Sequence, residues 1–187
     1  MKNLRMFCIS LEPSHYNFIK NLGYEPVGLG EKNFDYKWLT DSSKINISTK
    51  NKYYGEYTYH YWIWKNYLNH LNDEWIGFCQ YRKFWSFENF NKKDINFKSL
   101  NHQVIKEIPD NLNKYESILG EPIFINQFRL MKFLKKGLKF FVKRPETFFN
   151  ANKRNLNFHF DFSHGEYNLS KAIDLLDDKN REDFRKY

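Results

Sequence analysis

The sequence predicts an α/β domain with a mainly parallel sheet and flanking helices. Three segments predict strands: Leu4–Ser10, the short Glu25–Gly28, and Trp75–Tyr81, which is a near-continuous apolar run. Apolar runs without alternation are typical of strands that are buried on both faces. Helical patterns stand between the three strands, and this alternation is typical of a sheet built from crossover connections.

Helices are predicted on either side of the second strand. Pro13 suits the first turn of a helix that runs to about Leu22, and Gly23 suits the position after its end. Lys32–Asn51 is polar and irregular. A second helix is predicted over Glu56–His70, because aromatic and apolar residues recur there every three or four positions. These residues are Tyr57, Tyr61, Trp64 and Leu68.

The pattern weakens after Arg82. We expect a long loop at Phe84–Asn101, a helix at Phe128–Arg144 that Pro145 ends, and an aperiodic segment at Asn150–Asn168. The remaining predicted pieces are short: apolar segments at Val104–Ile108 and Tyr115–Leu119, and helices at Leu169–Leu176 and Arg181–Tyr187.

Length and composition favour one domain over residues 1–187, with a first half at 1–84 and a second half at 85–187. Aromatic residues make up 20% of the chain, which excludes a disordered protein. Cys8 and Cys79 are too few for a disulfide framework and predict two buried thiols in a reducing compartment. We expect neither a signal peptide nor a membrane-spanning helix, and therefore a cytoplasmic protein.

The net charge of +8 comes largely from the predicted helix Phe128–Arg144, which holds seven cations and no acid. Its apolar residues recur at helical spacing, which is typical of a helix that lies in a membrane interface. The membrane-facing lysines would be Lys132, Lys135, Lys136 and Lys139. A surface helix with its lysines in water is the alternative, and nucleic acid is a weaker candidate partner because no zinc-finger or RNA-recognition pattern is present.

A candidate site lies where the third predicted strand ends. Ligands of open α/β sheets bind beyond the carboxyl ends of strands. Arg82 and Lys83 can hold a phosphate or diphosphate there, with Lys50 as a third cation. Neutral groups that suit a ribose, sugar or base edge are Asn46, Ser48, Asn51, Gln80 and Tyr81. An ordinary solvated strand end is the alternative.

Four motifs in this region resemble a family of bacterial glycosyltransferase-like domains from capsule and lipopolysaccharide gene clusters. They are N-I-S-x-K-N from Asn46, Y-x-E-x-T from Tyr54, Y-W-x-W-K-N from Tyr61, and G-F-x-Q-Y-R-K-F from Gly77. The similarity covers Val27–Phe84, and a looser one covers Phe160–Tyr187.

The resemblance implies a nucleotide-sugar-binding fold of the GT-A type and transfer of a sugar from a nucleotide diphosphate to a glycan or lipid-linked acceptor. Some members of the family are thought to be galactofuranosyltransferases. Gln80 stands where the family usually has His, and Lys83 replaces a second Arg. The family is also expected to continue beyond the position of Tyr187.

An inverting sugar transfer needs a base for the acceptor hydroxyl. The candidates are Glu56, Asp161, His164 and Glu166, of which His164 lies in the looser family stretch. Many such enzymes hold Mg²⁺ or Mn²⁺ with a D-x-D pair, but no such pair follows a predicted strand, so we assign no metal-binding residues. Mg²⁺ or Mn²⁺ that comes with the nucleotide sugar is an alternative, and so is a metal held by the loop residues His159, Asp161, His164 and Glu166.

The leading prediction is therefore a glycosyltransferase that lies on the cytoplasmic side of the inner membrane. A non-catalytic or truncated relative that still binds the sugar nucleotide is the first alternative. A nucleic-acid-binding protein is the second.

Overall fold

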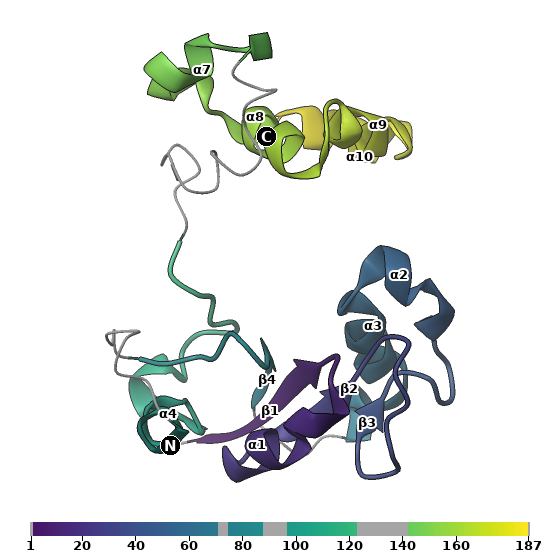
Figure 1. Ribbon diagram of the computed structural model, residues 1–187, viewed down its shortest axis with the longest axis vertical. Helices are drawn as coiled ribbons and strands as arrows, with labels where there is room; N and C mark the ends of the chain where they lie inside the picture. The colour runs from purple at the N-terminus through teal and green to yellow at the C-terminus, as the bar shows by residue number, and fades with distance from the viewer. Residues whose placement is uncertain (1, 71–74, 88–96, 123–141, 187) are drawn as a thin grey trace. The chain divides into compact units, whose positions relative to one another are not determined.

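The computed structural model describes residues 2–70, 75–87, 97–122 and 142–186. The chain forms two compact units, Met1–Gly120 and Glu121–Tyr187 (Figure 1). The boundary that the sequence predicts between its two halves follows residue 84. The structure groups residues 97–120 with the first unit, because Leu100, Val104 and Ile108 are buried there.

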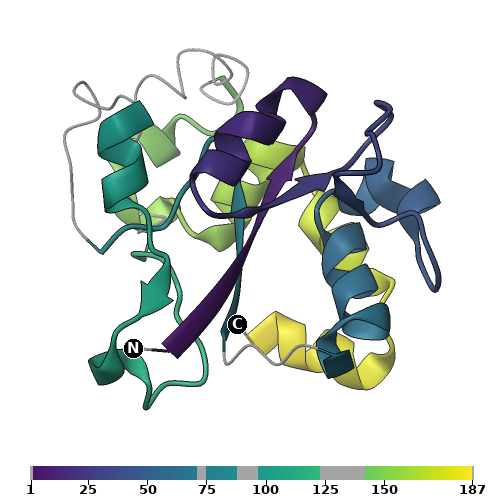
Figure 2. The same ribbon diagram turned by 90° about the horizontal axis from the view of Figure 1, so that it is seen from below.

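A mainly parallel sheet forms the centre of the first unit, as the sequence predicts. Its strands are β1 (Lys2–Ser10), β2 (Glu25–Gly28), β3 (Leu39–Thr40) and β4 (Trp75–Gln80), in the spatial order β3-β2-β1-β4. These four strands run parallel. The two-residue strand β5 (Glu107–Ile108) pairs antiparallel with the start of β1. Figure 2 shows β1 as the long central strand of this unit, beside β4.

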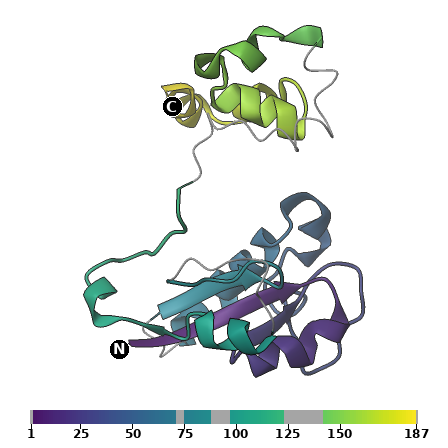
Figure 3. The same cartoon turned by 60° about the vertical axis from the view of Figure 1, so that its left-hand side comes forward.

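Helices cover both faces of the sheet because successive side chains of β1 point in opposite directions. Met6 and Cys8 join a core with residues of α1 (Tyr16–Asn21) and α4 (Phe97–Gln103). Phe7 and Ile9 join a second core with α3 (Tyr57–Asn66). Figure 3 shows α1 and α4 on one side of the sheet and α3, with α2 (Asn51–Tyr54), on the other. The arrangement buries β1 on both faces.

The two predicted helices of this unit are present and shorter than expected. The first begins as the 3-10 turn η1 (Pro13–His15) and continues as α1, after which Gly23 adopts a positive φ of 81°. The second is α3, followed by η3 (Leu68–His70). Two further 3-10 turns in this unit are η2 (Ser48–Lys50) and η5 (Asp110–Leu112).

The predicted loop at Phe84–Asn101 is wrong at its end, where α4 begins at Phe97. The helix was missed because its apolar residues are few, and it depends on burial of Leu100 against the sheet.

Both cysteines are buried free thiols, as predicted. They face each other in register on neighbouring strands, Cys8 on β1 and Cys79 on β4. A hydrogen bond with Cys8 and burial raise the pKa of the Cys79 thiol. Cys79 is therefore a poor nucleophile and serves the core.

The second unit is helical throughout its described part. Its elements are α7 (Glu146–Phe149), η6 (Ala151–Lys153), α8 (Leu156–His164), α9 (Asn168–Asp174) and α10 (Asp178–Lys186). The aperiodic assignment of Asn150–Asn168 is wrong, because α8 lies within it. Two caps define this helix: the Asn155 side chain accepts a hydrogen bond from Phe158 N, and Gly165 ends it with a φ of 102°.

The predicted helix Phe128–Arg144 lies outside the described residues except for its last three positions. The predicted membrane lysines Lys132, Lys135, Lys136 and Lys139 also lie outside them. In the parts of the chain that are described, no helix has the length and hydropathy needed to cross a bilayer.

Candidate functional site

The carboxyl ends of β1, β2 and β4 meet at one edge of the sheet. Ser10 lies in register with Gly28 at the end of β2, and Ile9 lies in register with Gln80 at the end of β4. The chain leaves β1 toward β2 on one side, whereas β4 lies on the other side of β1. The strand order therefore reverses at β1, and such a switch point is where open α/β sheets bind ligands.

A cavity of about 540 Å³ opens at this edge. Its volume lies in the range of small-molecule sites. The lining comes from the ends of β1, β2 and β4, from α2, and from the segment that leads from α2 into the start of α3. The lining residues are Ile9, Leu11, Leu29, Asn51, Lys52, Tyr53, Tyr54, Gly55, Glu56, Tyr57, Gln80, Tyr81 and Arg82. We refer to this cavity as the strand-end crevice.

Glu56 and Gln80 are in direct contact in the crevice. Glu56 precedes the first turn of α3, and its Oε2 accepts a hydrogen bond from Nε2 of Gln80 at the end of β4. Both residues are partly buried. Glu56 is the one carboxylate among the residues that line the crevice. The sequence singled out both residues, and the fold brings them together because α3 begins at the edge where β4 ends.

His60 lies one turn after Glu56 on α3. Its ring packs on Phe78 with centroids 4.3 Å apart, and its Nε2 has no hydrogen-bond partner among the described residues. Burial lowers the pKa of His60 below its ordinary value, and the nearby Glu56 opposes the shift. Burial therefore favours the neutral form of this histidine.

Tyr81 and Arg82 form the rim of the crevice directly after β4. The chain turns there, since Lys83 N donates to the Gln80 carbonyl over 2.8 Å and Gln80 N donates back to the Lys83 carbonyl over 3.3 Å. The Arg82 guanidinium lies over the Tyr81 ring, 5.1 Å from its centroid. Arg82 and Lys83 are both exposed, and Lys83 does not line the crevice.

A histidine that the sequence analysis did not single out holds this rim in place. The His15 ring stacks on the Tyr81 ring with centroids 4.5 Å apart, and His15 Nδ1 lies 2.9 Å from Ser10 Oγ. Ser10 ends β1 and His15 precedes α1. No sequence pattern signals this role, because the contact joins segments that are distant in the chain.

Asn51 and Gly55 shape the opposite wall. Asn51 Nδ2 donates to the Gly55 carbonyl over 2.9 Å and to Thr58 Oγ1 over 3.0 Å. Gly55 has a φ of 55° and a ψ of −131°, a conformation that side chains disfavour. This glycine elbow between α2 and α3 directs Tyr53, Tyr54 and Glu56 to the crevice.

The other residues predicted from the first motif lie elsewhere. Asn46 is used within its own loop: its Nδ2 donates to the Lys44 carbonyl over 2.9 Å, and its Oδ1 accepts from Ser48 Oγ over 2.9 Å. Lys50 is exposed at the end of η2. None of the three lines the strand-end crevice. Asn46 and Ser48 thus order the loop that precedes α2.

The comparisons bear on this unit. The chain matches the model of a domain of unknown function, DUF4422, over residues 10–139. It belongs to the DUF4422 family. Comparison with curated proteins and with solved structures gave no match. The matched DUF4422 region contains nearly every residue of the strand-end crevice, from Leu11 to Arg82, and ends before α8.

The remaining base candidates lie in the second unit, beyond the DUF4422 match. Asp161 is buried, and its Oδ1 accepts from Tyr167 N over 3.0 Å while its Oδ2 lies 3.5 Å from Arg144. Glu166 pairs with Lys143 at 2.8 Å. His164 is exposed and packs on Phe160. Asp161 therefore has a structural role in the tight turn that follows α8.

The described residues do not fit a carboxylate-bound divalent ion. In the described part of the DUF4422 chain no three His, Cys, Asp or Glu side chains are grouped to hold a metal. The crevice lining supplies one carboxylate, which already accepts the Gln80 hydrogen bond. Mg²⁺ and Mn²⁺ prefer several oxygen ligands.

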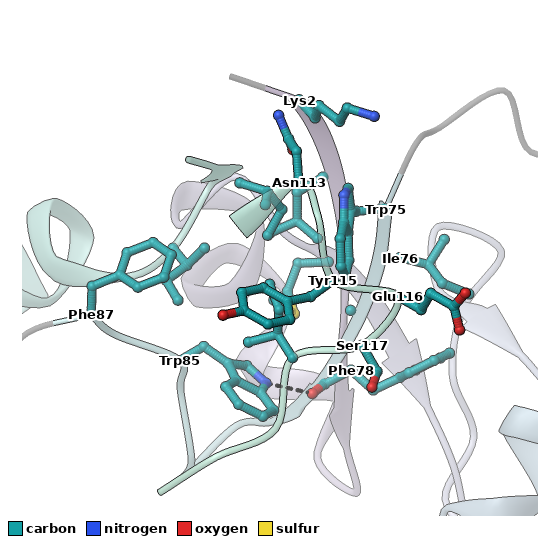
Figure 4. Close-up of a pocket in the computed structure, with 16 residues that line it drawn as sticks. Lys2, Trp75, Ile76, Phe78, Trp85, Phe87, Asn113, Tyr115, Glu116 and Ser117 are labelled. Atoms are coloured by element: carbon teal, nitrogen blue, oxygen red, sulfur yellow. Dashed lines mark hydrogen bonds between the residues drawn. The ribbon is translucent and has the colours of Figure 1, made fainter. Parts of the chain in front are cut away.

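A second cavity of the first unit, of about 550 Å³, is lined by the first residues of β1 and β4, away from the carboxyl ends of these strands (Figure 4). Its lining is mainly apolar and includes the aromatic residues Trp75 and Phe78 of β4 together with Trp85, Phe87 and Tyr115. Trp85 Nε1 donates to the Phe78 carbonyl over 2.8 Å. Lys2 and Glu116 are its charged residues. Its lining has one cation, whereas the lining of the strand-end crevice has two, Lys52 and Arg82.

Proposed function

We propose that the protein is a glycosyltransferase that uses a nucleotide-diphosphate sugar, with a GT-A-like arrangement of its first unit. The observation that carries the proposal is the strand-end crevice: one carboxylate, Glu56, and one arginine, Arg82, line a cavity at the switch point of a parallel sheet. The motifs around Tyr54–Thr58 and Gly77–Phe84, which resemble glycosyltransferase-like domains, supply the residues of this cavity.

The cations of the rim would hold the diphosphate. Arg82 offers a planar fork of donors for two phosphate oxygens, and the adjacent Lys83 adds a point charge. As the bond between the sugar carbon and the diphosphate breaks, negative charge grows on the leaving oxygen. Fixed cations stabilise that charge without a metal step.

Glu56 would act on the acceptor. Its carboxylate accepts the proton of the acceptor hydroxyl while the acceptor oxygen forms its bond to the sugar carbon. The nucleoside diphosphate leaves with the electron pair of the broken bond. Gln80 holds the Glu56 carboxylate in place through its amide, and Tyr81 can offer a hydroxyl to the donor sugar. Asp161 and His164 remain secondary candidates for the base.

The proposal includes where in the cell the protein acts. The basic amphipathic segment at 128–144 suits the inner membrane surface, where lipid-linked acceptors for surface polysaccharides lie. A protein at the cytoplasmic face would meet nucleotide sugars there. Cosedimentation of the full chain with vesicles of anionic lipid tests this part, and charge reversal of Lys132, Lys135, Lys136 and Lys139 should release the protein.

The direct test uses uridine diphosphate as the probe. We expect it to raise the melting temperature of the wild-type chain, and Arg82→Ala to remove the shift. Arg185→Ala is the matched control, because Arg185 is an exposed arginine of the second unit that pairs with Asp174. Turnover is then measured as release of uridine diphosphate from a panel of uridine-diphosphate sugars, galactofuranose included, with a glycolipid acceptor. Absence of both binding and turnover would refute the proposal.

One observation favours a non-catalytic relative as the second candidate. Gln80 occupies the position where the resembling family usually has a histidine, and its amide already hydrogen-bonds Glu56. A protein of this kind would bind uridine diphosphate through Arg82 and turn over no donor. Binding without turnover, unchanged by Glu56→Gln, would favour it.

A further inference from the structure

Aromatic side chains form an exposed row that leads away from the strand-end crevice. On α3, Tyr57 is 65% exposed and Trp64 is 58% exposed, with Tyr61 between them. Their spacing of four and three residues places all three on one face of the helix. At 1.5 Å per residue the row is about 10 Å long. The opposite face holds the core residues Thr58, Tyr59, Trp62 and Ile63.

The row is continuous with the crevice at Tyr57, which lines the cavity. Tyr53 and Tyr54 on α2 line the same cavity and are 75% and 52% exposed. Figure 1 shows α2 and α3 next to each other in the chain's first unit. We call these five side chains (Tyr53, Tyr54, Tyr57, Tyr61, Trp64) the aromatic row. Four of the five are exposed and Tyr61 is partly buried. Exposed apolar side chains that gather in one place are a mark of binding sites.

Two lysines lie on these rings. Lys65 Nζ is 3.5 Å from the centroid of the Trp64 ring, and Lys52 Nζ is 4.8 Å from that of Tyr53. Both contacts are cation–π interactions. Within the described residues neither lysine pairs with a carboxylate. The row therefore presents ring faces together with positive charge.

We propose that the aromatic row binds the acceptor as an acidic oligosaccharide, which rests on the glycosyltransferase function proposed above. Sugar rings expose apolar C–H faces that stack on electron-rich aromatic faces, and their hydroxyls hydrogen-bond with tyrosine hydroxyls. Lys52 and Lys65 complement carboxylates or phosphates on the glycan. The row begins beside Glu56, so a chain bound along α3 brings its terminal hydroxyl to the crevice.

The composition of the row distinguishes this ligand from a membrane. Interfacial helices insert Trp, Phe and Leu side chains and keep their lysines on the opposite face. Here four of five rings are tyrosines with polar hydroxyls, and the lysines lie on the rings themselves. A hydrated glycan satisfies both features.

The test measures binding of a tetrasaccharide of uronic acid residues to the full chain by calorimetry, with a neutral tetrasaccharide of glucose for comparison. We expect Trp64→Ala to weaken the acidic ligand by about tenfold or more, the scale of a lost stacking contact. Tyr36→Ala is the matched control, because Tyr36 is 91% exposed, carries Lys37 over its ring and lies outside the row. The acidic tetrasaccharide should bind more tightly than the neutral one.

Each other outcome has a defined meaning. If uridine diphosphate stabilises the protein but Trp64→Ala leaves glycan affinity unchanged, the glycan site is wrong and the donor site stands. If the glycan binds through Trp64 and uridine diphosphate does not bind, the transferase proposal fails while the glycan site stands. If Trp64→Ala abolishes binding to phosphatidylglycerol vesicles, the row binds a membrane and the glycan assignment is overturned. If Trp64→Ala dissociates a dimer, the row binds a second copy of the chain and the glycan assignment is likewise overturned.

Discussion

The imidazole ring of His15 stacks on the phenol ring of Tyr81, with centroids 4.5 Å apart and planes inclined by 28°. His15 Nδ1 also lies 2.9 Å from Ser10 Oγ. One residue thus links the end of β1 to the segment that follows β4. The Arg82 guanidinium lies over the Tyr81 ring. The position of Arg82 therefore depends on His15, which does not itself line the crevice.

Replacement of His15 should therefore weaken diphosphate binding without direct loss of a ligand. We expect His15→Ala to reduce the affinity for uridine diphosphate several-fold, because Tyr81 and Arg82 lose their support. His15→Phe keeps a ring on Tyr81 and should retain more affinity than His15→Ala. Calorimetry checks both, with the exposed His102→Ala as control. Equal affinities for wild type and His15→Ala would show that the rim is rigid without the histidine.

Glu56→Gln separates binding from chemistry. The substitution removes the proton acceptor, so we expect kcat to fall by about 10²–10⁴-fold, the scale of a general base. The melting temperature shift with uridine diphosphate should remain, since Arg82 supplies that contact. Glu146→Gln on the exposed first turn of α7 is the control and should keep full kcat. A Glu56→Gln enzyme with wild-type kcat would move the base to another residue.

Two buried tyrosines allow a paired test of stability. Tyr24 Oη donates to the Ile105 carbonyl over 2.6 Å, whereas Tyr59 Oη has no hydrogen-bond partner in the part of the chain that the structure describes. Burial raises the pKa of both phenols, so both are neutral. Tyr24→Phe leaves a buried carbonyl without its donor and should cost about 1–3 kcal/mol. Tyr59→Phe removes an unsatisfied hydroxyl and should leave the free energy of unfolding in urea unchanged or higher.

How far the sequence predicts the fold depends on what stabilises each element. β1 and β4 could be predicted because both faces are buried, which requires apolar runs. β3 and β5 could not, since each is two residues long and exists only through pairing with a neighbour. α8 was missed because its ends are set by Asn155 and Gly165 and its interior is rich in aromatic residues.

The residues of the candidate site also divide into those that the sequence could predict and those that it could not. Gln80 and Arg82 could be placed at the site because ligands of parallel sheets bind beyond the carboxyl ends of strands. Glu56 was one of four candidate bases, and only the fold shows its contact with Gln80. Asn46 and Ser48 could not be excluded, because a sequence does not show whether a polar side chain is used by its own loop. His15 could not be found, because its contact with Tyr81 depends on how α1 is packed.

Substitution of Asp161 tests whether this residue stabilises the second unit or takes part in catalysis. Its buried carboxylate holds Tyr167 N and lies beside Arg144. Asp161→Ala removes the acceptor of the Tyr167 N–H and the ion pair with Arg144, and should cost about 1–3 kcal/mol. Asp161→Asn keeps an acceptor for the Tyr167 N–H and should cost less. Asp174→Asn, at a more exposed ion pair, is the control for thermal unfolding. Loss of kcat in Asp161→Asn at unchanged stability would instead assign it a catalytic role.

His60 makes the stability of the first unit depend on pH in a defined direction. Burial lowers its pKa in the folded state, so between that value and the ordinary value of about 6.5 the unfolded chain binds more protons. Stability therefore falls as pH decreases through about 6.5 and levels off below the folded-state pKa. The loss is less than about 1.4 kcal/mol per pH unit, because one proton is involved.

His60→Phe keeps a ring on Phe78 and removes the titration, so its melting temperature should fall less than that of wild type between neutral and mildly acidic pH. His102→Asn, at an exposed position, should follow wild type. Parallel curves for wild type and His60→Phe would show that the histidine gains its proton without cost, and hence that Glu56 offsets its burial.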